Sequence, residues 1–118
     1  MSKIEFTLPW PPTVNHYWAR GRGGRMFIGD RGRSFRSNVA IYLMRKHSPT
    51  LSGRLSIVIK AYPPDRRKRD IDNIYKALLD ALQHGGLYGD DNQIDHLEIT
   101  RCKVEKPGRV ELIITERK

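Results

Sequence analysis

A short segment near the middle of the chain combines a run of cations with two closely spaced carboxylates. Residues 66–69 read Arg-Arg-Lys-Arg, Asp70 and Asp72 follow at once, and Lys76 lies four residues after Asp72. Carboxylate oxygens are ligands of Mg²⁺, which takes only a few of them and keeps several waters. A bound metal polarises a phosphate and orients a nucleophilic water, and a nearby cation stabilises the developing charge. Asp70, Asp72 and Lys76 are therefore candidates for phosphodiester hydrolysis.

The same residues also have a purely structural interpretation. Asp70 could cap the helix that begins here, and Asp72 could interact with the positive end of that helix. Asp72 and Lys76 could form an exposed i, i+4 pair that contributes only about a few tenths of a kcal/mol. The spacing of these three residues leaves both interpretations open.

A second acidic group follows the same predicted helix. Asp90-Asp91-Asn92 lies between the glycines at 85–86 and an apolar run that begins near Ile94. A helix and the strand after it are usually neighbours, so this loop could fold back toward one end of the helix. Asp90 is typical of an Asx turn, which leaves Asp91 as the candidate third carboxylate. Asp80, one turn beyond the lysine, is interpreted as a solvated salt-bridge partner.

Positive charge is concentrated in the N-terminal half of the chain. Residues 1–64 hold 11 basic and 2 acidic residues, whereas residues 65–118 hold 11 of each sign. Such a field favours a polyanion through phosphate contacts and counterion release, and nucleic acid over acidic lipid. Trp10, Tyr17 and Trp18 could stack on unpaired bases or pack in the core. The candidate DNA contacts are Arg20, Arg22, Arg25, Arg31, Arg33, Arg66, Arg67, Lys68 and Arg69.

Length and composition exclude several classes of protein. The 118 residues predict a single domain, 1–118, with one modest core. No apolar run is long enough for a membrane span, and the N-terminus lacks the apolar stretch of a signal peptide. The lone Cys102 fits a reducing cytoplasm. The histidines lack metal-ligand spacing, which argues against zinc, and residues 21–24 do not form a phosphate-binding loop.

Apolar periodicity predicts the elements that must position the candidate residues. Alternating apolar residues predict four strands, at residues 4–8, 55–61, about 94–104 and 110–114. A phase change between Ile99 and Cys102 predicts a bulge. Helical spacing predicts a helix capped by Ser34 and a stronger helix over 71–84, whereas residues 20–33 predict a flexible loop. The β-α-β-α-β-β order predicts an α/β (α+β) domain, a small mixed sheet with two helices packed on it.

In their order and spacing, these features resemble the RusA-type Holliday-junction resolvases, the crossover-junction endodeoxyribonucleases. The resemblance covers almost the whole chain and depends on the set of motifs rather than on any one of them. The motifs are Leu8-Pro9-Trp10-Pro11-Pro12 with Asn15 beyond, the basic run joined to Asp70-x-Asp72-Asn73 and Lys76, Leu79-Asp80-Ala81-Leu82, Asp90-Asp91 before Gln93-Ile94, and a last strand ending in Thr115-Glu116.

The resemblance implies a homodimer that binds four-way DNA junctions and makes paired, symmetric, Mg²⁺-dependent cuts in recombination and repair. It places the family's essential acidic residues on Asp70, Asp72 and Asp91, as ligands of Mg²⁺, and its essential lysine on Lys76. Genes of this family are often carried by phages and prophages, so either a phage or a host origin fits a cytoplasmic enzyme.

Two other functions stay open at this point. A non-catalytic nucleic-acid-binding module explains the charge equally well, but it gives no reason for three carboxylates and a lysine at these spacings. A metal nuclease of broader branched-DNA specificity would use the same residues. Cleavage of a junction with and without Mg²⁺ separates the first alternative, and competition with linear duplex separates the second.

Overall fold

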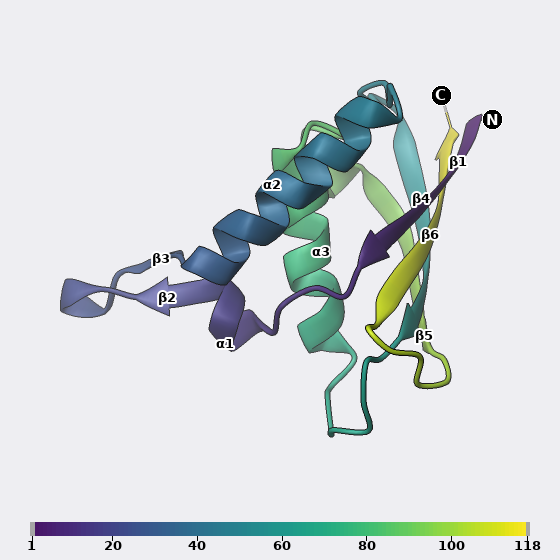
Figure 1. Cartoon of the computed structure of the whole chain (residues 1–118). Helices are drawn as coiled ribbons and strands as arrows, with labels where there is room; N and C mark the ends of the chain where they lie inside the picture. The colour runs from purple at the N-terminus through teal and green to yellow at the C-terminus, as the bar shows by residue number, and fades with distance from the viewer. Residues whose placement is uncertain (1, 118) are drawn as a thin grey trace.

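The computed structural model describes residues 2–117, and its centre is a four-stranded sheet with two helices on one face (Figure 1). The strands lie in the order β1 (Ser2–Pro9), β6 (Arg109–Arg117), β4 (Arg54–Tyr62) and β5 (Ile94–Arg101). Strand β6 is antiparallel to both of its neighbours, whereas β4 and β5 are parallel. The helices are α2 (Asp30–Arg45) and α3 (Asp72–His84). The predicted mixed sheet with two main helices is therefore confirmed.

The core lies between the sheet and the two helices. Alternate residues of the two central strands are fully buried, namely Leu55, Ile57, Ile59 and Ala61 in β4 and Val110, Leu112 and Ile114 in β6. Helix α3 buries Ala77, Leu78 and Leu82 at helical spacing. Burial of one large aliphatic side chain contributes about 1.5–3 kcal/mol. This apolar stripe fixes the rotation of α3, so Asp72 and Lys76 face solvent.

Helix α3 begins and ends close to its predicted limits of 71–84. Ile71 precedes the first helical residue, Asp72, and its side chain is 36% exposed. At the other end, Gly86 has a φ of +90°, a conformation that residues with a side chain rarely adopt. The glycine pair therefore stops the helix for the reason that the sequence indicates.

Residues 20–33 are ordered into elements, so the prediction of a flexible loop is wrong. A short helix α1 (Val14–Tyr17) leads into β2 (Trp18–Arg20), a 3-10 turn η1 (Arg22–Gly24) and β3 (Met26–Ile28). The two strands pair antiparallel. Residues 18–28 form an arm that projects from the body (Figure 1). Strands of three residues with little to bury give no apolar alternation, so periodicity does not reveal them.

Helix α2 begins at Asp30, four residues before the predicted N-cap Ser34. The residue before the helix is Gly29, which makes no side-chain capping bond. Gly32 decides the packing of the first turn, because a Cβ there would lie 2.4 Å from the Tyr17 carbonyl oxygen. The first turn is thus ordered by close backbone contact rather than by an apolar face. Within residues 2–117, no helix is long and apolar enough to cross a membrane.

The irregularity in the third main strand lies near its start, not between Ile99 and Cys102 as predicted. The pairing of β4 with β5 shifts between Leu55, opposite Ile94, and Ser56, opposite His96. Strand β5 ends at Arg101. The phase change in the sequence therefore marks the point where the chain leaves the sheet edge.

Candidate active site

Asp70 and Asp72 lie at the start of α3, and both are exposed. The Asp70 backbone carbonyl accepts a hydrogen bond from the Asn73 amide at 3.1 Å, but no side chain caps the helix. Among the side chains that the structure describes, which leave out residues 2, 14 and 15, neither carboxylate has a hydrogen-bond or ion-pair partner, and Lys76 has none either. The capping and ion-pair interpretations are therefore wrong, whereas Asp72 does lie in the first turn of α3, where a negative charge interacts favourably with the positive end of the helix.

The loop before α3, residues 63–71, is held in place by Arg69, and we call it the anchored loop. The Arg69 Nη2 atom lies 2.8 Å from Asp65 Oδ1, and the guanidinium carbon lies 5.5 Å from the centre of the Trp10 ring. Arg101 donates a further hydrogen bond to the Arg69 carbonyl. The Arg69 side chain is only 14% exposed. This network fixes the point at which Asp70 leaves the loop.

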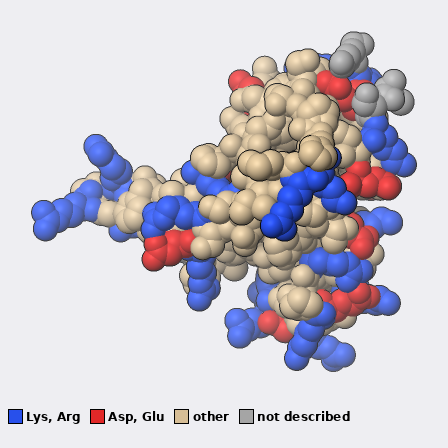
Figure 2. Space-filling model, turned by 45° about the horizontal axis from the view of Figure 1, so that its top comes forward, with Lys and Arg blue, Asp and Glu red and all other residues tan. Residues whose placement is uncertain are grey.

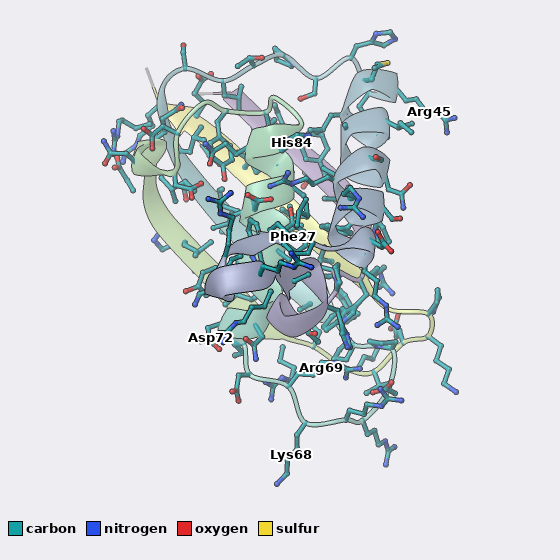
Figure 3. All side chains as sticks on the ribbon, turned by 90° about the vertical axis from the view of Figure 1, so that its left-hand side faces the viewer. Phe27, Arg45, Lys68, Arg69, Asp72 and His84 are labelled. Carbon is teal, nitrogen blue, oxygen red and sulfur yellow. The ribbon has the colours of Figure 1, made fainter. Side chains whose placement is uncertain are left out.

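The other cations of the anchored loop face solvent. Arg66, Arg67 and Lys68 are exposed, and Lys68 points away from the body (Figure 3). Asp65 accepts a hydrogen bond from the Arg67 backbone amide at 3.0 Å. That bond and, after it, the Arg69 guanidinium hold the pKa of Asp65 below its usual range. Of the four cations predicted to contact DNA here, Arg66, Arg67 and Lys68 are at the surface, where Arg67 Nε also lies 3.8 Å from Asp65 Oδ2, and Arg69 mainly shapes the loop.

Asp91 begins the 3-10 turn η2 (Asp91–Gln93) and is held by a buried tyrosine. The Tyr88 hydroxyl lies 2.9 Å from both Asp91 Oδ1 and the Leu79 carbonyl oxygen. Burial and, after it, the Asp91 carboxylate raise the pKa of Tyr88, so its hydroxyl stays protonated and donates. The loop therefore folds back onto α3, next to the turn that contains Leu79.

Asp90 has the turn role that the sequence indicates. Its side chain accepts a hydrogen bond from the Asn92 amide at 2.8 Å, and Gln93 Oε1 accepts from the Asp90 amide at 3.1 Å. These reciprocal bonds form a capping box. The box orients η2 and leaves the Asp91 carboxylate exposed at the surface.

One chain does not bring Asp70, Asp72 and Asp91 into one metal site. Among residues 2–117, no three His, Cys, Asp or Glu side chains are placed to share an ion. The Tyr88 hydroxyl links Asp91 to the Leu79 carbonyl, which belongs to a later turn of α3 than Asp72. Asp70 and Asp72 match the one or two carboxylates that Mg²⁺ commonly takes beside substrate phosphates and water. The role of Asp91 as a third ligand stays a prediction.

Asp80 is a partly buried side chain that connects helices, and the sequence analysis did not predict this connection. Its Oδ2 atom lies 2.8 Å from Arg36 Nη2 and also accepts a hydrogen bond from the Tyr17 hydroxyl. Burial and, after it, Asp80 raise the pKa of Tyr17. Asp80 is a salt-bridge partner, as predicted, but it joins α1, α2 and α3 instead of lying in solvent. No sequence spacing links three residues so far apart.

The cations of the arm and of the first turn of α2 divide into free and engaged residues. Arg20, Arg22 and Arg25 are exposed and make no side-chain bond within the described residues. Arg31 Nη1 lies 3.0 Å from His16 Nδ1, and Arg33 donates to the Ile28 carbonyl at 2.8 Å and pairs with Asp30. Figure 2 shows blue cationic side chains along the projecting arm. The arm thus presents positive charge away from the core.

The fold and its surface define a small basic α+β protein with uncommitted carboxylates at the start of a helix. Residues 9–115 match the family described as Endodeoxyribonuclease RusA, and the chain belongs to that family. Among its relatives is the crossover junction endodeoxyribonuclease rusA of Enterobacteria phage HK97, which is 41% identical over 117 residues, 98% of this chain and 97% of the relative. The proteins of that name from Escherichia coli strain K12 and Enterobacteria phage 82 are 39% and 40% identical over the same shares.

Proposed function

We propose that this protein is an endodeoxyribonuclease that resolves four-way DNA junctions by paired, Mg²⁺-dependent cuts in recombination and repair. The observation that carries the proposal is the free set of Asp70, Asp72 and Lys76 at the start of a rigidly held helix, beside exposed cations. The branched DNA substrate is inferred from the names of the relatives, which are crossover junction endodeoxyribonucleases. Relatives from phages and bacteria fit action on DNA in a bacterial cytoplasm.

The proposed Mg²⁺ would be held by Asp70 and Asp72, with Asp91 as a third ligand. When bound, such an ion polarises a phosphate and activates water. The anchored loop presents Asp70, and the apolar stripe of α3 directs Asp72 outward. Lys76, one turn further along the helix, stabilises negative charge on the phosphate oxygens.

We propose that the active form is a homodimer. Resolution of a four-way junction requires two matched cuts, and an isologous dimer presents two identical sites. Sedimentation at micromolar concentration should show a dimer. A monomer that still makes paired cuts would contradict this part of the proposal.

The main test is Asp70→Asn, which keeps the shape of the side chain and removes its charge. In metal-free buffer this variant should bind a labelled four-way junction as tightly as the wild type or more tightly, because a carboxylate repels phosphate. With Mg²⁺ added, it should fail to cut. Glu98→Gln is the matched control, because Glu98 is an exposed carboxylate on β5 whose ion pair, among the described side chains, is with His96. The control should cut normally.

The outcomes separate the proposal from its alternatives. Normal cutting by Asp70→Asn would contradict the assigned site. Binding without any Mg²⁺-dependent cutting by the wild type would favour a non-catalytic module. Equal cutting of junctions, flaps and other branched substrates would favour a nuclease of broader specificity.

A further inference from the structure

A hollow of about 520 Å³ lies at the root of the arm, and the carboxylates of the candidate active site do not line it. Its volume falls within the range of about 300–1,000 Å³ that is usual for small-molecule sites. The side chains that line it combine aromatic, thioether and cationic groups: His16, Trp18, Arg20, Met26 and Arg31. None of these residues has a role in the proposed hydrolysis.

Trp18 is a fixed aromatic surface in this hollow. Its ring packs edge-on against Tyr17, with ring centres 5.2 Å apart, and the Arg36 guanidinium carbon lies 5.8 Å from its centre. Tyr17 is fully buried and bonded to Asp80, so the body of the protein holds the indole in place. A fixed indole is a suitable platform for stacking a planar base.

Met26 adds an exposed apolar group on the same side. Its side chain is 53% exposed. Met26 on β3 pairs with Arg20 on β2, and Arg20 lies two positions after Trp18. Because side chains alternate along a strand, those of Trp18, Arg20 and Met26 lie on one face of the arm. Phe27, the next residue, lies on the other face, packs against Gly21 and does not line the hollow. Met26 therefore lines the hollow, whereas Phe27 on the opposite face of the hairpin does not.

The polar groups of the hollow are arranged to donate hydrogen bonds to an anionic, acceptor-rich partner. Arginine only donates, so the 3.0 Å contact of Arg31 makes His16 Nδ1 an acceptor and leaves Nε2 to carry the proton. The guanidinium groups of Arg20 and Arg31 add positive charge. The one carboxylate in the lining, Asp30, is paired with Arg33.

We propose that this hollow receives an unstacked nucleobase from branched DNA, with Trp18 and Met26 against its face and the arginines on adjacent phosphates. The inference rests on the proposed function. A base inside a continuous duplex must first be unstacked and unpaired, which costs a few kcal/mol, whereas a base at a branch point is less well stacked. The hollow therefore favours junctions over linear DNA. The two arginines that line the hollow complement a polyanion.

Photo-crosslinking tests the location of the base. An immobile four-way junction with 5-iodo-2′-deoxyuridine at the branch point is irradiated with the wild-type protein in metal-free buffer, and the linked peptide is identified by mass spectrometry. The crosslink should fall on Trp18, Met26 or His16. The same probe placed deep in a duplex arm should not link to these residues. Crosslinks confined to other parts of the chain would overturn the inference.

Two neighbouring variants test the energetic role of the hollow. Met26→Ala should bind the junction roughly tenfold more weakly, the size expected when one apolar side chain no longer covers the base, and should bind linear duplex as before. Phe27→Ala is the matched control, because it removes a similarly exposed apolar side chain from the opposite face, and it should keep junction affinity. Circular dichroism checks that both variants are folded.

The remaining outcomes also decide the inference. Equal junction affinity for the two variants, with normal cutting by the wild type, would overturn the hollow as a base site and leave the proposed function intact. A change in sedimentation of Met26→Ala without DNA would show that the hollow is a contact between copies. A wild type that neither binds nor cuts junctions would remove the proposed function as well.

Discussion

The arm and the anchored loop are both strongly basic, but the structure uses their arginines differently. In the anchored loop, Arg69 lies in the body of the protein, ion-paired to Asp65 and stacked over Trp10. In the arm, Arg22 and Arg25 are exposed without side-chain partners among the described residues. The arm depends on its own strand pairing and on contacts at its root, such as the 2.9 Å bond from the Gly29 amide to the Tyr17 carbonyl.

This difference shows that the role of an arginine depends on its surroundings rather than on the basic run in which it occurs. A carboxylate within reach and an aromatic ring beneath it make Arg69 a structural residue. Without such partners, the guanidinium groups of the arm arginines are available to contact phosphates. We infer that the anchored loop holds catalytic groups still, and that the arm reaches along the DNA.

The largest expected effect comes from Lys76, next to the anchored loop. Lys76→Ala should reduce the cleavage rate by about 10²–10³-fold, the usual loss when one group that stabilises a transition state is removed. Junction binding should change little, and Mg²⁺ affinity should be normal or slightly raised because a positive charge is gone. Single-turnover cleavage and Mg²⁺ titration measure the two properties. Loss of metal affinity together with activity would mean that Lys76 organises the carboxylates instead.

Arg69→Ala should lower the free energy of unfolding by about 1–3 kcal/mol, because it breaks hydrogen bonds of a largely buried charged group. It should also slow cleavage, because Asp70 loses its fixed position. Arg67→Ala is the control, since that side chain is 83% exposed and its 3.8 Å pair with Asp65 is at the surface, so its loss should change stability by less than about 0.5 kcal/mol. Urea denaturation of both variants is the measurement. Equal free energies of unfolding for the two variants would contradict the proposed difference between the anchoring Arg69 and the exposed Arg67.

Neutralising two arm residues, Arg22→Gln with Arg25→Gln, should affect binding but not stability. If each arginine contacts one phosphate, the slope of log K against log salt should become shallower by about one unit per contact. Junction affinity across a salt series measures this slope, with the unfolding midpoint as the internal check. An unchanged slope would show that the arm faces away from DNA.

The smallest expected effect is a pH dependence of the anchored loop. The Arg67 amide and Arg69 hold the pKa of Asp65 below its unfolded value of about 3.9. A carboxyl group with a depressed folded pKa contributes stability that is present above the unfolded value and lost as pH falls through the folded one. The loop should therefore stay intact at neutral pH and loosen only in acid below about pH 4. An NMR titration of the Asp65 carboxyl, absent in Asp65→Asn, should show the low midpoint. A midpoint at the unfolded value would contradict the anchoring bonds.

Most of the sheet and the longest helical stripe could be predicted from the sequence, because burial leaves a periodic trace. The alternation of Ile57, Ile59 and Ala61 in β4 and the stripe of Leu78 and Leu82 in α3 are confirmed. The arm left no such trace, since its strands bury little. The early start of α2 left none either, because a backbone contact at Gly32 decides it.

The sequence by itself determined which residues could do chemistry, since residue type and spacing fix the charges and ligands available. It indicated Asp70, Asp72, Asp91 and Lys76 and the turn role of Asp90. Only the tertiary structure decided which charges are free. It joined Asp80 to Tyr17 and Arg36 on two other helices, turned Arg69 inward onto Asp65, and set Asp91 beside Tyr88. The physical reason is that pairing and burial depend on contacts between distant segments, which no local pattern encodes.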